Sequence, residues 1–283
     1  MPIRHFQTLL ESHWSHGRFL CIGLDSELLK LPASAVKYDI QGNVDLVKSL
    51  ISFNRRIIES THDLVCAYKP NTAFYEAYGA LGMVALQETI LLIHKIAPKV
   101  PVILDAKRAD IGNTNHGTVT FAFDYLKADA ITLHPYLGKE ALEPFLARPE
   151  KGIFILCRTS NSGSGEFQNL SLSGESLYKI IASRVAKDWN THHNCGLVVG
   201  ATYPEELSHV RKIVGNMPLL IPGIGAQGGS VEKTVIAARN NQGTGMIINS
   251  SRGIIFASKE ENFAEAARHE TEKLDLLIRK IIS

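Results

Sequence analysis

The stretch Val-Pro-Val-Ile-Leu-Asp-Ala-Lys at residues 100–107 is a short, β-branched apolar run that ends in charged side chains. Similar apolar runs recur along the chain at residues 19–25, 64–70, 130–135, 152–159, 195–202, 217–223 and 243–251. They are almost continuously apolar rather than alternating, which is typical of parallel strands covered on both faces. Longer stretches with helical spacing separate them, so the sequence predicts alternating β and α units.

The connections between these runs favour one closed barrel. Crossover helices between parallel strands fit residues 43–60, 83–96, 174–189, 204–214 and 230–239. No Pro/Ser-rich boundary, low-complexity tract or close repeat divides the 283 residues. We therefore expect a single α/β domain over residues 1–283, a (β/α)₈ TIM barrel with an N-terminal lead-in and closing helices in 260–282. A doubly wound open sheet is the alternative.

Composition narrows the function classes. The chain has 30 Lys plus Arg against 28 Asp plus Glu, a formal net charge of +2, and no basic cluster of the kind that nucleic acid or an anionic membrane requires. Charged residues interrupt the first 20 positions, which argues against a signal peptide, and no stretch of 18 apolar residues predicts a membrane span. The four cysteines lie in or beside apolar runs without CxxC spacing, so we expect reduced, buried thiols and a cytoplasmic location.

Polar side chains follow nearly every apolar run. In a barrel the carboxyl ends of the strands build the active site, so these residues should converge on one rim. Any one of them could equally be a solvated loop position, but their joint position predicts a site. The residues concerned are Asp25, Lys69, Asp105, Lys107, His134, Thr159, Ser160, Ser251 and Arg252.

The densest cluster is Leu-Asp-Ala-Lys-Arg-Ala-Asp-Ile-Gly-Asn-Thr at residues 104–114. Because side chains alternate along a strand, Asp105 and Lys107 should point to the same side. Asp110 follows in the loop, and Lys69 from the neighbouring strand completes a set of two cations and two anions. A structural salt-bridge network is the simpler interpretation. The set also suits chemistry on a carboxylate, because crowded like charges raise the energy of a bound anion while an ammonium can donate a proton.

A glycine-rich stretch, Pro-Gly-Ile-Gly-Ala-Gln-Gly-Gly at residues 222–229, matches GxGxxG after a strand. A dinucleotide site expects an acidic residue about 20 positions later, but residues 240–251 contain no Asp or Glu. The loops after strands seven and eight of such barrels often bind phosphate, and Arg252 can add a bidentate contact. We expect a phosphorylated small molecule here, with a glycine turn of no chemical role as the alternative.

A third cluster, Cys-Arg-Thr-Ser-Asn-Ser-Gly-Ser-Gly-Glu at residues 157–166, opens a loop rich in glycine and short polar side chains. The hydroxyls of Thr159 and Ser160 suit a planar heterocycle, and a plain flexible loop has nearly equal weight. The eleven histidines show no HxxxH or HxH spacing, and no GxSxG elbow occurs, so neither a metal site nor a serine nucleophile is predicted. We expect His116 and His134 to be structural.

Residues 105–114 resemble the DxKxxDIxxT signature of the orotidine 5′-phosphate decarboxylases. Residues 68–71, 156–165 and 223–229 are similar to the longer bacterial-type branch of that family, and the resemblance extends from residue 21 to residue 253. Ala109 is one departure, because the family pattern leads us to expect glycine there. The alanine could alter the loop backbone, but it removes no catalytic group.

The resemblance implies decarboxylation of orotidine 5′-phosphate to uridine 5′-phosphate and carbon dioxide, the last step of de novo pyrimidine synthesis, without metal or organic cofactor. It implies that Lys69, Asp105, Lys107 and Asp110 form the charged tetrad. Lys107 would protonate C6 of the pyrimidine, and Asp105 would crowd the substrate carboxylate.

The resemblance also implies the substrate contacts. Ribose hydroxyls would meet Asp25, Lys69 and Thr114, the pyrimidine edge would meet Ser160, and the phosphate would meet Gln227 and Arg252. We place Pro222 and Ser251, at the same strand ends, in the substrate-binding set. A homodimer is implied, because Asp110, Ile111 and Thr114 reach into the neighbouring subunit's site in this family. The alternatives are a sugar-phosphate barrel enzyme that uses a metal or a Schiff-base lysine, and a nucleotide-binding regulator without chemistry.

Overall fold

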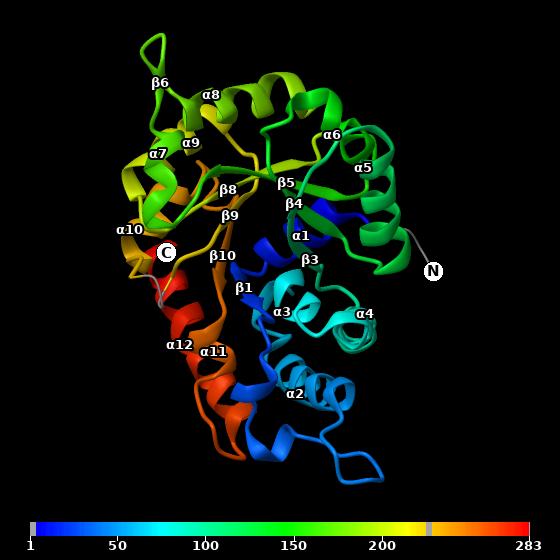
Figure 1. The fold of residues 1–283 in the computed structure, drawn as a ribbon. Coiled ribbons are helices and arrows are strands. Elements are labelled where there is room, and N and C mark those ends of the chain that lie inside the picture. The colour runs from blue at the N-terminus through cyan, green and yellow to red at the C-terminus, as the bar shows by residue number, and fades with distance from the viewer. Residues whose placement is uncertain (1–3, 225–227, 283) are drawn as a thin grey trace.

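Eight parallel strands form one sheet in the computed structural model, which describes residues 4–224 and 228–282 (Figure 1). Each strand overlaps one of the eight apolar runs, so the predicted strands are confirmed. Their order in the sheet is β2-β1-β10-β9-β8-β5-β4-β3, which follows the chain around a ring. The strands are β1 (Leu20–Gly23), β2 (Val65–Lys69), β3 (Ile103–Arg108), β4 (Ala130–Leu133), β5 (Gly152–Arg158), β8 (Cys195–Val199), β9 (Leu219–Ile221) and β10 (Met246–Ser250).

The two ends of this sheet, β2 and β3, meet through single bridges. Tyr68 pairs with Val102, and Asn71 pairs with Asp105, both in parallel. The amide of Asp105 donates to the carbonyl oxygen of Pro70 at 2.9 Å. These bonds close the sheet into a TIM barrel, so the alternative of an open doubly wound sheet was wrong.

Helices surround the barrel, and five of them confirm the predicted crossovers: α2, α4, α8, α9 and α10. The crossover of α5 and α6 was missed, because residues 112–119 are rich in Gly, Asn and Thr and carry no apolar stripe. The α-helices are α1 (Phe6–Trp14), α2 (Leu46–Thr61), α3 (Thr72–Glu76), α4 (Gly79–Ile96), α5 (Gly112–Val119), α6 (Gly138–Leu146), α7 (Gly165–Gln168), α8 (Leu177–Arg184), α9 (Pro204–Val214), α10 (Val231–Ala238), α11 (Arg252–Ile255) and α12 (Phe263–Ile282).

Short elements complete the connections. Two π-helical segments continue α5 and α8, and a small antiparallel hairpin follows α7, which the sequence did not predict. The short elements are η1 (Leu28–Lys30), η2 (Ala33–Ala35), η3 (Thr120–Tyr125), η4 (Ser162–Ser164), η5 (Val185–Trp189), β6 (Ser171–Leu172) and β7 (Glu175–Ser176).

The N-terminal lead-in closes the end of the barrel where the strands begin. The Trp14 indole in α1 donates to the carbonyl oxygen of Met246, the first residue of β10, at 2.9 Å. Phe6 packs edge-on against Phe154, with ring centroids 5.6 Å apart. Gly152 begins β5 in direct contact with Phe6, because a β-carbon there would lie 2.5 Å from the ring. These contacts plug the amino end of the barrel core, so a ligand site within the barrel is expected at the carboxyl ends of the strands.

Helix α4 is long and apolar enough to cross a membrane by length and composition alone. In this fold it packs against α2 and α3 as one of the barrel's surrounding helices, and 39% of it is buried. The sequence analysis did not single it out as a span.

Candidate active site

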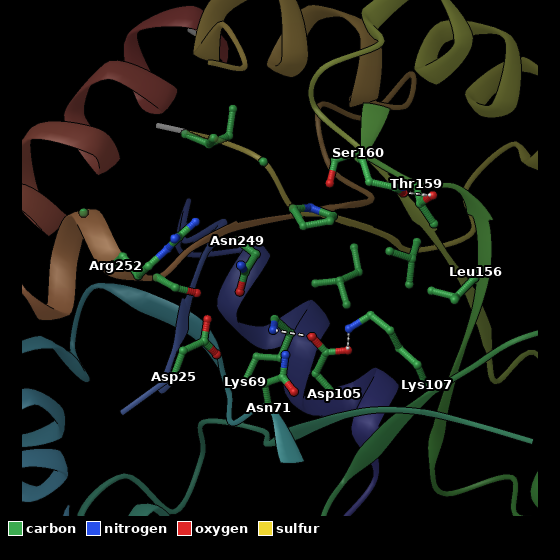
Figure 2. A pocket seen from close by; sticks show the side chains of 18 of the residues that line it. Asp25, Lys69, Asn71, Asp105, Lys107, Leu156, Thr159, Ser160, Asn249 and Arg252 are labelled. Atoms are coloured by element: carbon green, nitrogen blue, oxygen red, sulfur yellow. Dashed lines mark hydrogen bonds and ion pairs between the residues drawn. The ribbon is translucent and has the colours of Figure 1, made fainter. Parts of the chain in front are cut away.

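A cavity of about 520 Å³ opens at the carboxyl ends of the strands (Figure 2). It brings together nine of the predicted site residues, drawn from six strand ends. These are Asp25, Lys69, Asp105, Lys107, Thr159, Ser160, Pro222, Ser251 and Arg252. Further side chains line it that sequence reasoning did not place there, among them Asn71, Leu156, Asn161, Gln168, Val198, Leu220, Ile224 and Asn249. The predicted residue Gln227 lies outside the described residues.

A row of three charges forms the floor of the cavity. The Lys69 ammonium lies 2.7 Å from Asp105 Oδ2, and the Lys107 ammonium lies 2.7 Å from Asp105 Oδ1. The hydroxyl of Thr132, which the sequence analysis did not single out, donates to the same Oδ1 at 2.9 Å. Asp105 therefore accepts three hydrogen bonds and cannot rotate away without breaking at least one of them.

Burial and the neighbouring charges shift the pKa values of Asp105 and Lys69 in opposite directions. Burial disfavours the ionised Asp105, but the ammonium groups of Lys69 and Lys107 outweigh it and hold the pKa of Asp105 well below its usual range. Burial likewise disfavours the charged Lys69, but Asp105 and Asp25 outweigh it and raise the pKa of Lys69 above its ordinary value. Asp105 and Lys69 therefore remain charged throughout the neutral range.

The pKa shifts of Asp105 and Lys69 predict how stability depends on pH. The unfolded chain binds a proton at Asp105 before the folded state does, so acid should lower the free energy of unfolding once the pH drops below about 4. The unfolded chain also loses the Lys69 proton first, so stability should fall again above about pH 10. Urea unfolding across this range would measure both losses. Asp105→Asn should make both losses of stability smaller. If the free energy of unfolding of this variant changed with pH just as that of the wild type does, the two losses would not come from Asp105 and Lys69.

The backbone at Lys107 is strained. Its φ of 47° lies in the left-handed region, which costs a side-chain-bearing residue about 1–3 kcal/mol. The pairing of β3 with β4 shifts register between Leu104 and Arg108, and the Lys107 amide donates to Thr132 Oγ1 at 3.0 Å. Simple alternation predicted that Asp105 and Lys107 share a side. They do line one cavity, but an irregularity in the strand, rather than regular pleating, turns Lys107 inward.

The wall next to Lys69 joins the ends of β1 and β10. Gly23 allows this close approach, because a β-carbon there would lie 1.8 Å from Ser251 Oγ and 3.5 Å from Asp25 Oδ1. Asp25 Oδ1 is buried without a hydrogen-bond partner in the described part of the chain. Arg252 begins α11 directly after this wall and is exposed at the cavity rim. An acceptor and a guanidinium thus line the cavity beside the Lys69 end of the charged row.

The loop after β5 is held by Arg158, which is 2% exposed. Its guanidinium donates to Ser164 Oγ and to Gln168 Oε1 and lies 3.8 Å from the centre of the Tyr203 ring. Gln168 in turn accepts from the Thr159 amide at 2.9 Å and donates to Thr159 Oγ1 at 2.9 Å. Arg158 therefore fixes the cavity wall that carries Thr159 and Ser160. This role was not predictable from the sequence, because an arginine within a strand run is usually a surface residue.

Replacing Arg158 with methionine should loosen this loop while the barrel stays folded. The barrel should survive because the one charged partner left behind, Glu206, is 26% exposed and can be solvated, so no unpaired charge stays buried. The hydrogen bonds to Ser164 and Gln168 are lost, so limited proteolysis within residues 159–176 should be about five- to ten-fold faster. Arg148→Met, which removes ion pairs outside this loop, is the matched control. Unchanged cleavage of the Arg158 variant would contradict the anchoring role.

Three predicted residues, Asp110, Ile111 and Thr114, do not line the cavity of their own chain. All three are exposed, and Ile111 is 60% exposed. The Asp110 amide donates to Asn115 Oδ1 at 2.9 Å, and Asp110 Oδ1 accepts from the Ile111 amide at 2.8 Å. Ala109, just before them, is not at positive φ, so the backbone accommodates alanine there without left-handed strain.

A closed (β/α)₈ barrel with a charged, partly enclosed cavity at its carboxyl-end rim has the architecture of a barrel enzyme. Residues 18–267 match the Orotidine 5′-phosphate decarboxylase / HUMPS family, and the chain belongs to that family. Decarboxylases are carboxy-lyases, and the chain is an enzyme of this class.

Individual relatives agree with this assignment. The chain is 48% identical over 265 residues to the orotidine 5′-phosphate decarboxylase of Azoarcus sp. (strain BH72), covering 93% of this chain and 94% of the relative. It is 52% identical over 255 residues to that of Herpetosiphon aurantiacus, covering 90% of each. Its fold is similar to the structure of Leishmania donovani UMP synthase, with a TM-score of 0.86 and 39% identity, covering 98% of this chain and 56% of that one.

Proposed function

We propose that this chain converts orotidine 5′-phosphate to uridine 5′-phosphate and carbon dioxide in de novo pyrimidine synthesis, as a cytoplasmic homodimer without metal or organic cofactor. The observation that carries the proposal is the row Lys69, Asp105 and Lys107 on the floor of a cavity with Arg252 at its rim. The row offers a fixed anion and fixed proton donors, and the arginine suits a phosphate.

The proposed chemistry uses the row directly. The bond from C6 to the carboxylate breaks, carbon dioxide leaves, and the electron pair stays on C6. Lys107 gives that carbon a proton, and its neutral amine regains one from solvent. Asp105 is held ionised by Lys69 and Lys107, so it repels the substrate carboxylate but not the product. The preorganised ammonium stabilises the charge that develops on C6.

The remaining predicted residues bind the rest of the nucleotide in this proposal. Asp25 and Lys69 contact the ribose hydroxyls, and Ser160 contacts the pyrimidine edge. Pro222 and Ser251 line the cavity between these groups and the rim. Arg252 binds the phosphate together with Gln227. Energy from the phosphate end can offset the cost of placing two carboxylates together at the other end.

The second subunit completes the site in this proposal. Asp110 and Thr114 are exposed, which suits residues that act in a neighbouring chain. The exposed apolar side chains of Ile111, Tyr136 and Leu137 support an interface here, because Tyr136 and Leu137 lead into α6, which packs against α5. A second copy that covered these side chains would bring its Asp110 to the charged row.

The proposed activity is tested by following the absorbance of orotidine 5′-phosphate with purified protein in excess EDTA. We expect the substrate absorbance to disappear and the rate to be unaffected by the chelator or by borohydride. Inhibition by either reagent would favour the sugar-phosphate class of barrel enzymes, which uses a metal or a Schiff base. Tight binding of uridine 5′-phosphate without turnover would favour a non-catalytic regulator.

Arg252→Ala should lower kcat/KM by about 10- to 100-fold, because a charge-assisted contact to the phosphate is lost. The Arg252 side chain is exposed, so the free energy of unfolding should change by no more than about 0.5 kcal/mol. Steady-state kinetics and urea unfolding measure the two effects. Arg55→Ala, on the outer face of α2, is the control. Unchanged kcat/KM and KM in the Arg252 variant would exclude the phosphate role.

A further inference from the structure

Asn249 is a buried amide at the cavity, and its oxygen has no hydrogen-bond partner among residues 4–224 and 228–282. It lies in β10, lines the cavity and is 6% exposed. Its Oδ1 is buried and accepts no hydrogen bond from any described residue. Because a buried polar group that stays unpaired is costly, such an amide at a ligand cavity indicates that the ligand supplies the partner.

The other carboxamides of the cavity differ from Asn249. Asn161 Oδ1 accepts from Thr159 Oγ1 at 2.6 Å, and Asn71 Oδ1 accepts from the Ala73 amide at 3.1 Å, where it caps α3. Gln168 is bonded on both sides, to Arg158 and Thr159. These three amides make hydrogen bonds within the protein, whereas the Asn249 oxygen makes none with the described residues.

The position of Asn249 indicates which part of the ligand its side chain contacts. Side chains alternate along β10, so Asn249 and Ser251 share the inner face, with Asn249 two residues deeper. Figure 2 shows Asn249 above the Lys69 ammonium, with Arg252 to its left and Asp25 below and to its left. In the proposed function these neighbours bind the ribose and the phosphate, so Asn249 faces the sugar end.

The hydrogen-bonding capacity of the amide also limits which group of the ligand it can bind. A phosphate offers only acceptors, so it would leave Asn249 Oδ1 unpaired. A hydroxyl both donates and accepts, as a carboxamide does. Asp25 Oδ1, on the neighbouring strand end, is a second buried oxygen without a partner in the described chain. Two such oxygens suit two adjacent hydroxyls.

We propose that Asn249 binds a ribose hydroxyl of the nucleotide and makes the site select ribose over deoxyribose. The inference rests on the proposed function, because it takes the ligand to be a pyrimidine ribonucleotide. A site that pairs a buried amide with a substrate hydroxyl rejects the analogue that lacks it, because the amide is then left unpaired.

Calorimetric binding of three ligands tests this role: uridine 5′-phosphate, its 2′-deoxy form and its 3′-deoxy form. The deoxy penalty is the ratio of the Kd of a deoxy analogue to the Kd of uridine 5′-phosphate. In the wild-type protein this ratio should exceed one for the analogue that lacks the bound hydroxyl. Asn249→Ala should reduce the ratio for that analogue by about five- to ten-fold. Asn161→Ala, the same truncation at an amide that already has a partner, should keep the wild-type penalties. Asn249→Ser gives a second variant if the alanine variant does not fold.

The outcomes separate the inference from the proposed function. If both deoxy penalties in a folded Asn249 variant equal those of the wild type, the role of Asn249 is overturned while the decarboxylase proposal stands. If the wild type neither binds uridine 5′-phosphate nor consumes orotidine 5′-phosphate, the proposed function fails and the inference fails with it. A penalty reduced equally in Asn161→Ala would also overturn the role, because it would show a general loosening of the cavity.

Discussion

Lys107→Ala is expected to leave a folded protein whose turnover of orotidine 5′-phosphate is lower by about 10³-fold or more. The substitution removes the group that we propose gives C6 its proton, together with one of the two ammonium groups beside Asp105. The fold should survive, because the Lys107 side chain is 48% exposed and Asp105 keeps its bonds to Lys69 and Thr132. Single-turnover absorbance measurements, with circular dichroism for the fold, would measure both effects.

Two further variants at residue 107 separate proton transfer from charge and from backbone strain. Lys107→Arg keeps a cation but cannot give up a proton readily, so it should be nearly as inactive. Lys107→Gly should also be inactive and yet more stable than Lys107→Ala by up to about 1 kcal/mol, because glycine adopts a φ of 47° without strain. If the alanine variant kept a tenth or more of wild-type turnover, C6 would have to take its proton from another group.

The barrel was predictable from the sequence because its strands are buried on both faces. A strand such as β8 is apolar throughout and fully buried, which produces a run that is easy to recognise. The crossover through α5 was not predictable, because residues 112–119 carry no apolar stripe. Asn115 instead holds the start of that helix by hydrogen bonds with the backbone of Asp110. Local hydrogen bonds can thus specify a helix where hydrophobic patterning does not.

The cavity was predictable only where a strand end carried an obvious charge. Asp105 and Lys107 stand out at the end of their run, and the structure places both in the cavity. Thr132 and Arg158 were missed, because their roles depend on the side chains that they contact across the barrel rather than on their own neighbours in sequence. Asn249 had a signal that could have been used, since it is a lone amide in an otherwise apolar part of residues 243–251.

The strained backbone of Lys107 and the closely spaced charges of the row must both be held in place by the surrounding fold. The row places a carboxylate between two ammonium groups in a mostly buried setting, and the backbone under Lys107 is held in a left-handed conformation. The left-handed backbone is unfavourable by itself, whereas the ion pairs of the row stabilise one another only while the three side chains are held together. Thr132 accepts from the Lys107 amide and donates to Asp105, and these bonds together with the closed barrel hold both features in place, so stability elsewhere in the fold supports the reactive arrangement.

Mixing the two inactive variants Lys107→Ala and Asp110→Ala should restore activity to roughly one quarter of the wild-type value, if Asp110 acts in the partner's site. After random exchange about half of the dimers are mixed. One site of each mixed dimer has Lys107 from one chain and Asp110 from the other, and its second site lacks both. Mass spectrometry of tagged chains would verify the exchange, and turnover would be measured over the same period.

The control mixes Lys107→Ala with Asp105→Ala. Asp105 and Lys107 lie 2.7 Å apart within one chain, so no exchange of subunits can rebuild an intact row and the mixture should stay inactive. Restored activity only with the Asp110 variant would place that carboxylate in the neighbouring subunit's cavity, as its exposure in its own chain leads us to expect. A mixture that stayed inactive after verified exchange would instead require the loop of residues 109–114 to fold over its own cavity when substrate binds.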